Sequence, residues 1–225
     1  MQLTFYGHAC VSLSLPDAAG TLVIDPGTLS DTGSALTGAA AVLITHDHFD
    51  HVDTPTVAGY LTSNPDVHVW STSPVATALR EGGAPADRVH EVAPGQVLDV
   101  AGARVTVGGG DHALIHPEVP RAVNFTYLVE VDGASVFHPG DSYEEPAQLP
   151  DGGLDVLLVP VSAPWMKMRE AIDFARSVPA GTVVPIHDVF LSEAGHTLTG
   201  RWLDTSRIGG DYTYTRLSVG QSLAV

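Results

Sequence analysis

The segment Ile44-Thr45-His46-Asp47-His48-Phe49-Asp50-His51 carries four potential metal ligands within six residues, directly after an apolar run. Alternate residues of an extended segment point the same way, so His46 and His48 can converge on one ion. Asp50 and His51 follow the turn and can face a second ion. Imidazole and carboxylate ligands without thiolate are typical of catalytic Zn²⁺, Mn²⁺ or Fe²⁺ sites rather than of structural zinc. The segment therefore predicts a catalytic metal centre at a strand end.

The surrounding sequence alternates strand-like and helix-like segments. The run Ala41–Thr45 is apolar throughout, which suits a strand covered on both faces. We expect further strands at Leu3–Tyr6, Val11–Leu15, Thr21–Asp25, Val67–Trp70, Gln96–Val100, Arg104–Gly108, Phe125–Val131, Ser135–Pro139, Leu154–Pro160, Thr182–Ile186 and Tyr212–Val219, and helices at Asp53–Ser63, Pro74–Glu81 and Met168–Ser177. The order indicates an α/β protein and is compatible with a four-layer αββα sandwich, although other α/β layouts share the pattern. We expect residues 1–225 to form a single domain.

Composition narrows the class of partner. The chain has 26 acidic and 10 basic residues and a formal net charge of −16, so it would repel nucleic acid, and we expect a small-molecule substrate instead. No apolar run approaches the roughly 20 residues of a membrane span, and no secretory leader is evident, so we expect no membrane insertion and a cytoplasmic location. The single cysteine, Cys10, is expected to be buried and inert. The sequence carries no pattern that indicates the oligomeric state.

The motif His46-x-His48-x-Asp50-His51 resembles the HxHxDH signature of the metallo-β-lactamase superfamily, including its position after an apolar strand. The likeness covers nearly the whole chain. It extends to the segments Phe5–Ala9, Ile24–Pro26 and Asp155–Pro160, which are similar to elements of a compact hydrolase subgroup. That subgroup is related to ascorbate-6-phosphate lactonase and to N-acyl-phosphatidylethanolamine phospholipase D. The resemblance implies a metallo-β-lactamase fold and two metal ions. We expect zinc, with Mn²⁺ or Fe²⁺ as alternatives.

The resemblance also implies three ligands downstream of the motif. His112, after the strand Arg104–Gly108, is similar to the family's third histidine; His116, four residues on, is its rival. Asp141 lies in a Gly-Asp element like that of the bridging aspartate, and His187 is similar to the closing histidine. Seven metal ligands are expected. One ion would be bound by His46, His48 and His112, and the other by Asp50, His51 and His187. Asp141 would lie between the two ions. Asp50 and Asp141 are also the expected catalytic carboxylates.

Other polar residues leave two interpretations open. His8 either faces the site or is structural. His138 either lines the pocket or packs beneath the loop that carries His46–His51. Asp25, at a strand end, can accept a proton from a ligand histidine or cap the turn before Pro26. His196 is expected in a flexible stretch, either in a solvated loop, which is favoured, or as a lid residue that reaches the pocket. Asp47 and Asp188 are expected outside the ligand shell, and His68 and His90 on the surface. Asn124 and Tyr127 are expected to be core, rim or substrate-contacting residues. Trp165, Met166 and Met168 are expected to form an apolar wall or to pack against the following helix.

The expected function is metal-dependent hydrolysis. A hydroxide bridging two metal ions would attack a small ester, lactone, amide or phosphodiester, because metal ions lower the pKa of bound water to about 7. Two alternatives remain: a di-iron redox protein of the same fold, since the ligands also suit iron, and a metal-binding module without turnover. The sequence carries no motif for the substrate.

Overall fold

The apolar run before the histidine motif forms β4 (Ala39–Ile44), an interior strand of a seven-stranded sheet. Ala41 and Leu43 point into the core between two sheets, whereas Val42 and Ile44 pack in a second cluster with the helices outside. All four side chains are fully buried. This confirms the expectation of a strand covered on both faces and explains why the run contains no polar residue.

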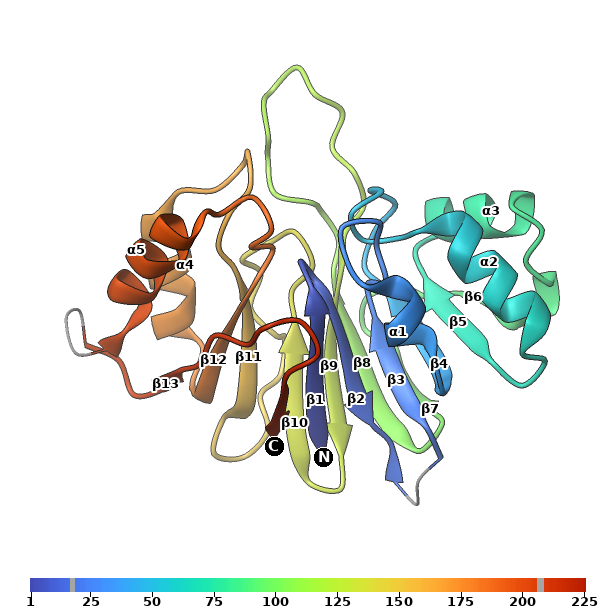
Figure 1. Cartoon of the computed structure of the whole chain (residues 1–225), viewed down its shortest axis with the longest axis horizontal. Helices are drawn as coiled ribbons and strands as arrows, with labels where there is room; N and C mark the ends of the chain where they lie inside the picture. Colours follow the sequence, from blue (N-terminus) through green and yellow to red (C-terminus); the bar gives the residue numbers. More distant parts are fainter. Residues whose placement is uncertain (17–18, 206–208) are drawn as a thin grey trace.

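Two sheets of seven strands each pack face to face in the computed structural model, which describes residues 1–16, 19–205 and 209–225 (Figure 1). In spatial order the first sheet consists of β14 (Ser222–Ala224), β1 (Gln2–Gly7), β2 (Cys10–Ser14), β3 (Thr21–Ile24), β4, β5 (His68–Ser71) and β6 (Val89–Glu91). The second consists of β13 (Thr213–Tyr214), β12 (Ala180–Ile186), β11 (Leu154–Pro160), β10 (Ala134–His138), β9 (Phe125–Val131), β8 (Ala103–Gly109) and β7 (Val97–Val100).

Each sheet is mixed. Strands β14, β1, β2 and β3 pair antiparallel, and β3 to β6 pair parallel. The second sheet repeats this arrangement, with antiparallel pairs from β7 to β10 and parallel pairs from β10 to β13. As expected, Asp132-Gly133 forms the hairpin turn between β9 and β10, with positive φ at both residues.

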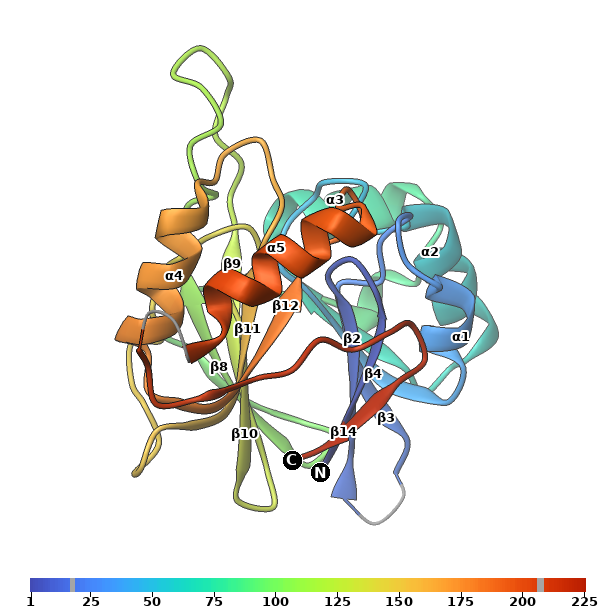
Figure 2. The ribbon, with the colours of Figure 1, turned by 60° about the vertical axis from the view of Figure 1, so that its left-hand side comes forward.

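Helices cover the outer face of each sheet, as Figures 1 and 2 show. Their bounds are α1 (Thr32–Leu36), α2 (Thr54–Ser63), α3 (Ser73–Glu81), α4 (Met168–Ser177) and α5 (Glu193–Leu203), with a 3₁₀ turn at Ala86–Arg88. The first three share a core cluster with the first sheet, and the last two share one with the second. The expected four-layer αββα sandwich is confirmed. No helix in the described ranges is long and apolar enough to cross a membrane.

Several elements differ from the sequence-based expectation. The stretch around His196 is part of α5 and not a flexible loop, because Ser192 caps the helix and Thr199 and Leu203 are buried despite two helix-weakening glycines. The expected strand Tyr212–Val219 shortens to β13, and β14 lies beyond it. Helix α1 and strand β6 were not expected at all. Both are short, and neither has a periodicity long enough to register.

Candidate metal centre

The candidate ligands follow strands that end at one edge of the sandwich. His46 follows β4, His187 follows β12, and Asp141 lies three residues after β10. His112 follows β8, and His8 follows β1. The edge therefore collects side chains that are distant in sequence, because strands that run in the same direction end at the same edge. Strands β1 and β8 run in the same direction as β3 and β10, since one antiparallel strand separates each pair.

His46, His48, His112 and Asp141 form the first of two clusters, with one ligand atom from each residue lying within 4.8 Å of all the others. His48 is half-buried, and the other three are buried. The structure brings His112 into this cluster. His116 is exposed, and its Nδ1 accepts a hydrogen bond from the Glu118 backbone within the loop between β8 and β9.

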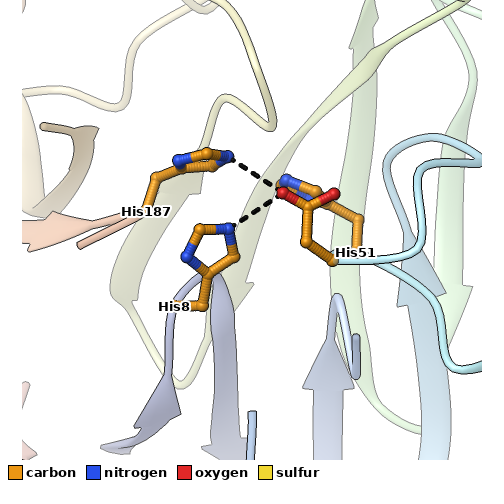
Figure 3. Close-up of side chains that lie close together, drawn as sticks. His8, His51 and His187 are labelled. Carbon is orange, nitrogen blue, oxygen red and sulfur yellow. Dashed lines mark hydrogen bonds and ion pairs between the residues drawn. The ribbon is translucent and has the colours of Figure 1, made fainter. Parts of the chain in front are cut away.

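The second cluster combines Asp50, His51 and His187 with His8, again with ligand atoms within 4.8 Å of one another. All four residues are buried. His8 Nε2 lies 3.0 Å and His187 Nε2 lies 3.4 Å from the same oxygen, Asp50 Oδ2. Figure 3 shows the side chains of His8, His51 and His187 close together. The sequence left the role of His8 open, and the structure places its ring inside the cluster.

Asp141 lies between the clusters and faces each with a different oxygen. Its Oδ1 is 3.1 Å from His51 Nε2 and 3.3 Å from His187 Nε2. Its Oδ2 is 3.2 Å from His112 Nε2. Ligand atoms bound to one tetrahedral zinc ion lie about 3.3 Å apart, because each is about 2.0 to 2.1 Å from the metal. The spacing therefore suits two ions that share this carboxylate.

Unpartnered buried atoms support the same interpretation. His46 Nε2, His51 Nε2, His187 Nε2 and Asp141 Oδ1 are buried, and none has a partner in hydrogen-bond geometry among the described residues. Buried polar atoms are normally satisfied, so a group of them pointing at one another indicates a missing cation. The residues present thus fit a pair of metal ions.

Backbone and carboxylate acceptors fix the outer nitrogen of three histidines. His51 Nδ1 lies 2.7 Å from Asp25 Oδ2, His187 Nδ1 lies 2.6 Å from the Ser162 carbonyl, and His112 Nδ1 lies 2.6 Å from the Ala113 carbonyl. These oxygens accept, so each Nδ1 carries a proton and each Nε2 is the nitrogen that faces the site. Asp25 therefore contacts a candidate ligand, as one of its two expected interpretations required.

Burial keeps several histidines neutral. Desolvation lowers the pKa of His46 well below its ordinary value, and it also lowers the pKa of His48 and His8. Burial raises the cost of an imidazolium that lacks sufficient compensating charge. A neutral imidazole is the form that binds a metal ion.

Carboxylates reverse this effect elsewhere. Burial by itself would lower the pKa of His51, but Asp141 and Asp25 raise it well above the usual range. Burial likewise opposes the rise at His187, where Asp141 and Asp50 bring the pKa to about 9. The carboxylates of Asp50 and Asp141 have lowered pKa values despite burial, because these histidines face them. The carboxylates thus favour the charged form of His51 and His187, and these two histidines favour the charged form of the carboxylates.

Strained backbone accompanies the site. His8, Asp25 and His187 have φ of 52°, 52° and 57°, in the left-handed region that side chains other than glycine rarely adopt. Each follows the last residue of a strand, so the chain turns sharply where the side chain enters or supports the site. Strain of this kind persists where the surroundings over-determine it, and it concentrates at functional sites.

The remaining polar residues fall outside both clusters. His138 Nε2 lies 2.9 Å from the Ala9 carbonyl, so it packs beneath the site. Tyr127 is a core residue whose hydroxyl donates to the Ile44 carbonyl, and Asn124 bonds the Pro139 carbonyl and the Asp141 backbone N–H. Asp47 is exposed. Asp188 is buried, its Oδ2 lies 3.8 Å from His196 Nδ1, and it is in neither cluster.

Two residue groups have contacts that the sequence did not predict. Trp165 was expected in an apolar wall or in helix packing, and its Nε1 also donates a hydrogen bond to Asp141 Oδ2 at 3.0 Å. His68 and His90 were expected to be unpartnered surface residues, yet their rings stack, with His68 Nδ1 2.7 Å from His90 Nε2. Neither contact has a local sequence signal, because the partners lie 24 and 22 residues apart.

A cavity of about 740 Å³ opens beside the first cluster. Trp165 connects the two, since it lines the cavity and bonds Asp141. The lining includes Asp111, Arg121, Tyr143, Glu144 and Glu170. The projecting loop between β8 and β9 contributes Ala113 and Leu114, so part of the wall is apolar (Figure 1). The volume is that of a small-molecule site.

The sandwich and its paired histidine–aspartate clusters define the class of protein, an αββα fold with a candidate dinuclear centre at one edge. A family model described as a β-lactamase superfamily domain matches residues 2–187, and the chain belongs to the metallo-β-lactamase superfamily. It is 38% identical over 194 residues to Protein Rv0786c of Mycobacterium tuberculosis, with 85% of this chain and 86% of that protein covered. It is 32% identical to a UPF0173 metal-dependent hydrolase of Methanoculleus marisnigri, with 83% and 80% covered.

Solved structures share the fold at low sequence identity. Igni18, a metallo hydrolase from Ignicoccus hospitalis, superposes with a TM-score of 0.72 at 17% identity and covers 99% of this chain and 97% of its own. CmlA, a diiron β-hydroxylase from Streptomyces venezuelae, superposes with a TM-score of 0.71 at 18% identity, over 100% of this chain and 54% of its own. One fold thus carries both types of protein, so the fold alone does not decide the reaction.

Proposed function

We propose that this chain is a metal-dependent hydrolase with two metal ions at the edge of the sandwich. The single observation that carries the proposal is Asp141, whose two oxygens face two different histidine clusters. The proposed ligands are His46, His48 and His112 for the first ion, Asp50, His51 and His187 for the second, and Asp141 for both. Zinc fits this set of imidazoles and carboxylates, and Mn²⁺ or Fe²⁺ would fit it as well.

The bound metals would supply an activated water at neutral pH and polarise the oxygen of the scissile group. The chain's own residues have the remaining tasks. Asp50 and Asp141 are the carboxylates beside the reacting atoms and can accept or return a proton. Trp165 donates to Asp141 Oδ2 and thereby fixes the orientation of this carboxylate. Asp25 holds the His51 ring from its far side.

The cavity bounds the substrate. About 740 Å³ admits a small molecule, and the Arg121, Tyr143 and Trp165 side chains that line it offer both polar and apolar contacts. An ester, lactone, amide or phosphodiester presents an oxygen that a metal can polarise. The net charge of −16 favours a neutral or weakly charged substrate of this kind over a nucleic acid.

The test combines metal analysis with turnover. Purified protein loaded with zinc should contain two equivalents of metal and should hydrolyse a member of a panel of lactones, esters, amides and phosphodiesters. His48→Ala and Asp141→Ala should each lower kcat/KM by at least about a hundredfold, as loss of a group that acts on the transition state does. His116→Ala is the matched control, because this histidine is exposed and lies outside both clusters.

Other outcomes would favour other functions. Unchanged activity in both variants would contradict the proposed centre. A visible charge-transfer band in the purified protein, with iron in place of zinc, would favour a redox protein like the diiron hydroxylase that shares the fold. Two bound metals without turnover on the whole panel would favour a metal-binding module.

A further inference from the structure

His8 is the one member of the two clusters that the proposed seven-ligand centre does not use. It follows β1 in the turn toward β2, and its side chain is fully buried. Its Nε2 lies 3.0 Å from Asp50 Oδ2. A histidine that merely filled space in this turn would not need to present a ring nitrogen to a candidate metal ligand.

The position of His8 is held by the backbone of another candidate ligand. The His187 backbone N–H donates to the His8 carbonyl at 2.7 Å, and the two imidazole rings lie with centroids 3.9 Å apart. Gly7 and His8 both have positive φ, at 103° and 52°, which turns the chain at the edge of the sheet and directs the ring inward. The loops after β1 and β12 are therefore connected at the site itself.

With His8, the two clusters have the same composition. Each contains three histidines and one aspartate, and in each the ligand atoms lie within 4.8 Å of one another. The 3.0 Å from His8 Nε2 to Asp50 Oδ2 is close to the spacing between other pairs of ligand atoms, 3.1 to 3.4 Å.

We propose that His8 is a fourth protein ligand of the second ion, in addition to the bridging Asp141, an inference that rests on the proposed dinuclear centre. The second ion would then be enclosed by His8, Asp50, His51 and His187, all of them buried. The first ion would keep an open side, because His48 is only half-buried and the cavity adjoins that cluster. The second ion is therefore the more firmly held, and the first faces the substrate.

The experiment is a metal titration of the metal-free protein with Zn²⁺ against a chromophoric chelator. Wild-type protein should bind two equivalents. His8→Asn, which keeps a residue type tolerant of the left-handed turn, should weaken one equivalent by at least about tenfold and leave the other unchanged. His116→Ala should bind both equivalents as wild-type does, because His116 is outside the clusters.

A second variant separates coordination from hydrogen bonding. His8→Gln has an amide that can donate to Asp50 but is a poor zinc ligand. Weak binding of one equivalent by both His8→Asn and His8→Gln supports coordination. Full affinity in His8→Gln would overturn the inference, because His8 would then act only by positioning Asp50.

A measurement on the unmodified chain avoids any dependence on variants that fail to fold. Zinc-loaded protein with ¹⁵N-labelled histidine should show six metal-bound imidazoles, three from each cluster. Five metal-bound imidazoles in a protein with two zinc ions would overturn the role of His8 and leave the proposed function intact. A protein that binds fewer than two ions in all conditions would instead contradict the dinuclear centre itself.

Discussion

At the scale of single residues, the site depends on contacts behind the ligands as well as on the ligands. Asp25 is fully buried and receives three hydrogen bonds of 2.7 Å, from the Thr45 backbone N–H, the Thr45 hydroxyl and His51 Nδ1. It thus connects Thr45, at the start of the loop between β4 and α2, to the candidate ligand His51. A carboxylate in this place fixes the ring orientation and raises the basicity of the histidine.

Replacement of Asp25 tests this contact. Asp25→Asn should lower the affinity for the second zinc ion about 10- to 100-fold, because the neutral amide is a poorer hydrogen-bond acceptor for His51. The measurement is a zinc titration of metal-free protein. Asp47→Asn is the control, since Asp47 lies beside His46 in sequence but is exposed. Equal affinities in the two variants would show that Asp25 does not support the metal.

The protonation of His187 predicts a pH dependence of metal affinity. In the metal-free protein its pKa is about 9, because Asp141 and Asp50 outweigh the opposing effect of burial. A zinc ion must displace this proton and also the proton on His51, whose pKa is raised as well, so zinc affinity should rise with pH up to about 9, by roughly tenfold per unit for each proton released. Calorimetric titrations in buffers of different ionisation enthalpy should detect the released protons. An affinity that stays flat between pH 6 and about 9 would contradict the assignment of His187 as a ligand.

At the scale of elements, close backbone packing holds the metal loop between β4 and α2. Gly27 follows β3 and lies against this loop, where an added Cβ would sit 1.9 Å from the Asp50 carbonyl oxygen. No side chain fits there without displacing the Asp50 backbone. The glycine is therefore required by the approach of two loops and not by its own φ.

Gly27→Ala should displace the loop that carries Asp50 and His51, with a cost of at least about 1 to 3 kcal/mol and loss of the second ion. Denaturant unfolding and zinc titration measure the two effects. Gly33→Ala is the matched control: Gly33 is in α1, has nothing within 4 Å of an added Cβ, and should gain up to about 1 kcal/mol. Wild-type stability and metal binding in Gly27→Ala would contradict the packing argument.

At the scale of the whole molecule, the two candidate ions would join both sheets. His46, His51 and Asp50 follow β4 of the first sheet, whereas Asp141 and His187 follow β10 and β12 of the second. Metal binding should therefore stabilise the packing of one sheet on the other.

The cytoplasmic location and the exclusion of nucleic acid stay predictions from the sequence.

Metal removal tests this connection. Addition of zinc to the metal-free protein should raise Tm, because a ligand at 100 times its Kd stabilises the folded state by about 2.7 kcal/mol per site. A chelator should reverse the shift, and Asp141→Ala should reduce it. Thermal unfolding followed by calorimetry measures all three. A Tm that does not respond to zinc in the wild-type protein would show that the ions do not contribute to folding.

The sequence determined the elements with strong local patterns. The apolar run before His46 predicted β4, and the His-x-His-x-Asp-His motif predicted four residues of the two clusters, because strand geometry places alternate side chains on one side. The order of strand-like and helix-like segments indicated the α/β class, and the resemblance implied the metallo-β-lactamase fold. The resemblance placed His112, Asp141 and His187 at strand ends. They gather at one edge because β8, β10 and β12 run in the same direction and therefore end at the same edge.

Contacts between residues far apart in the sequence depend on the packing of the two sheets and could not be predicted from local patterns. His8 joins Asp50 from 42 positions away, and Trp165 reaches Asp141 from 24. A lone histidine after a strand and a tryptophan in a loop carry no local signal, because contacts between loops depend on how the two sheets pack. Helix α5 was missed for a related reason: its glycines lower local propensity, and burial of Leu203 compensates only in the folded protein.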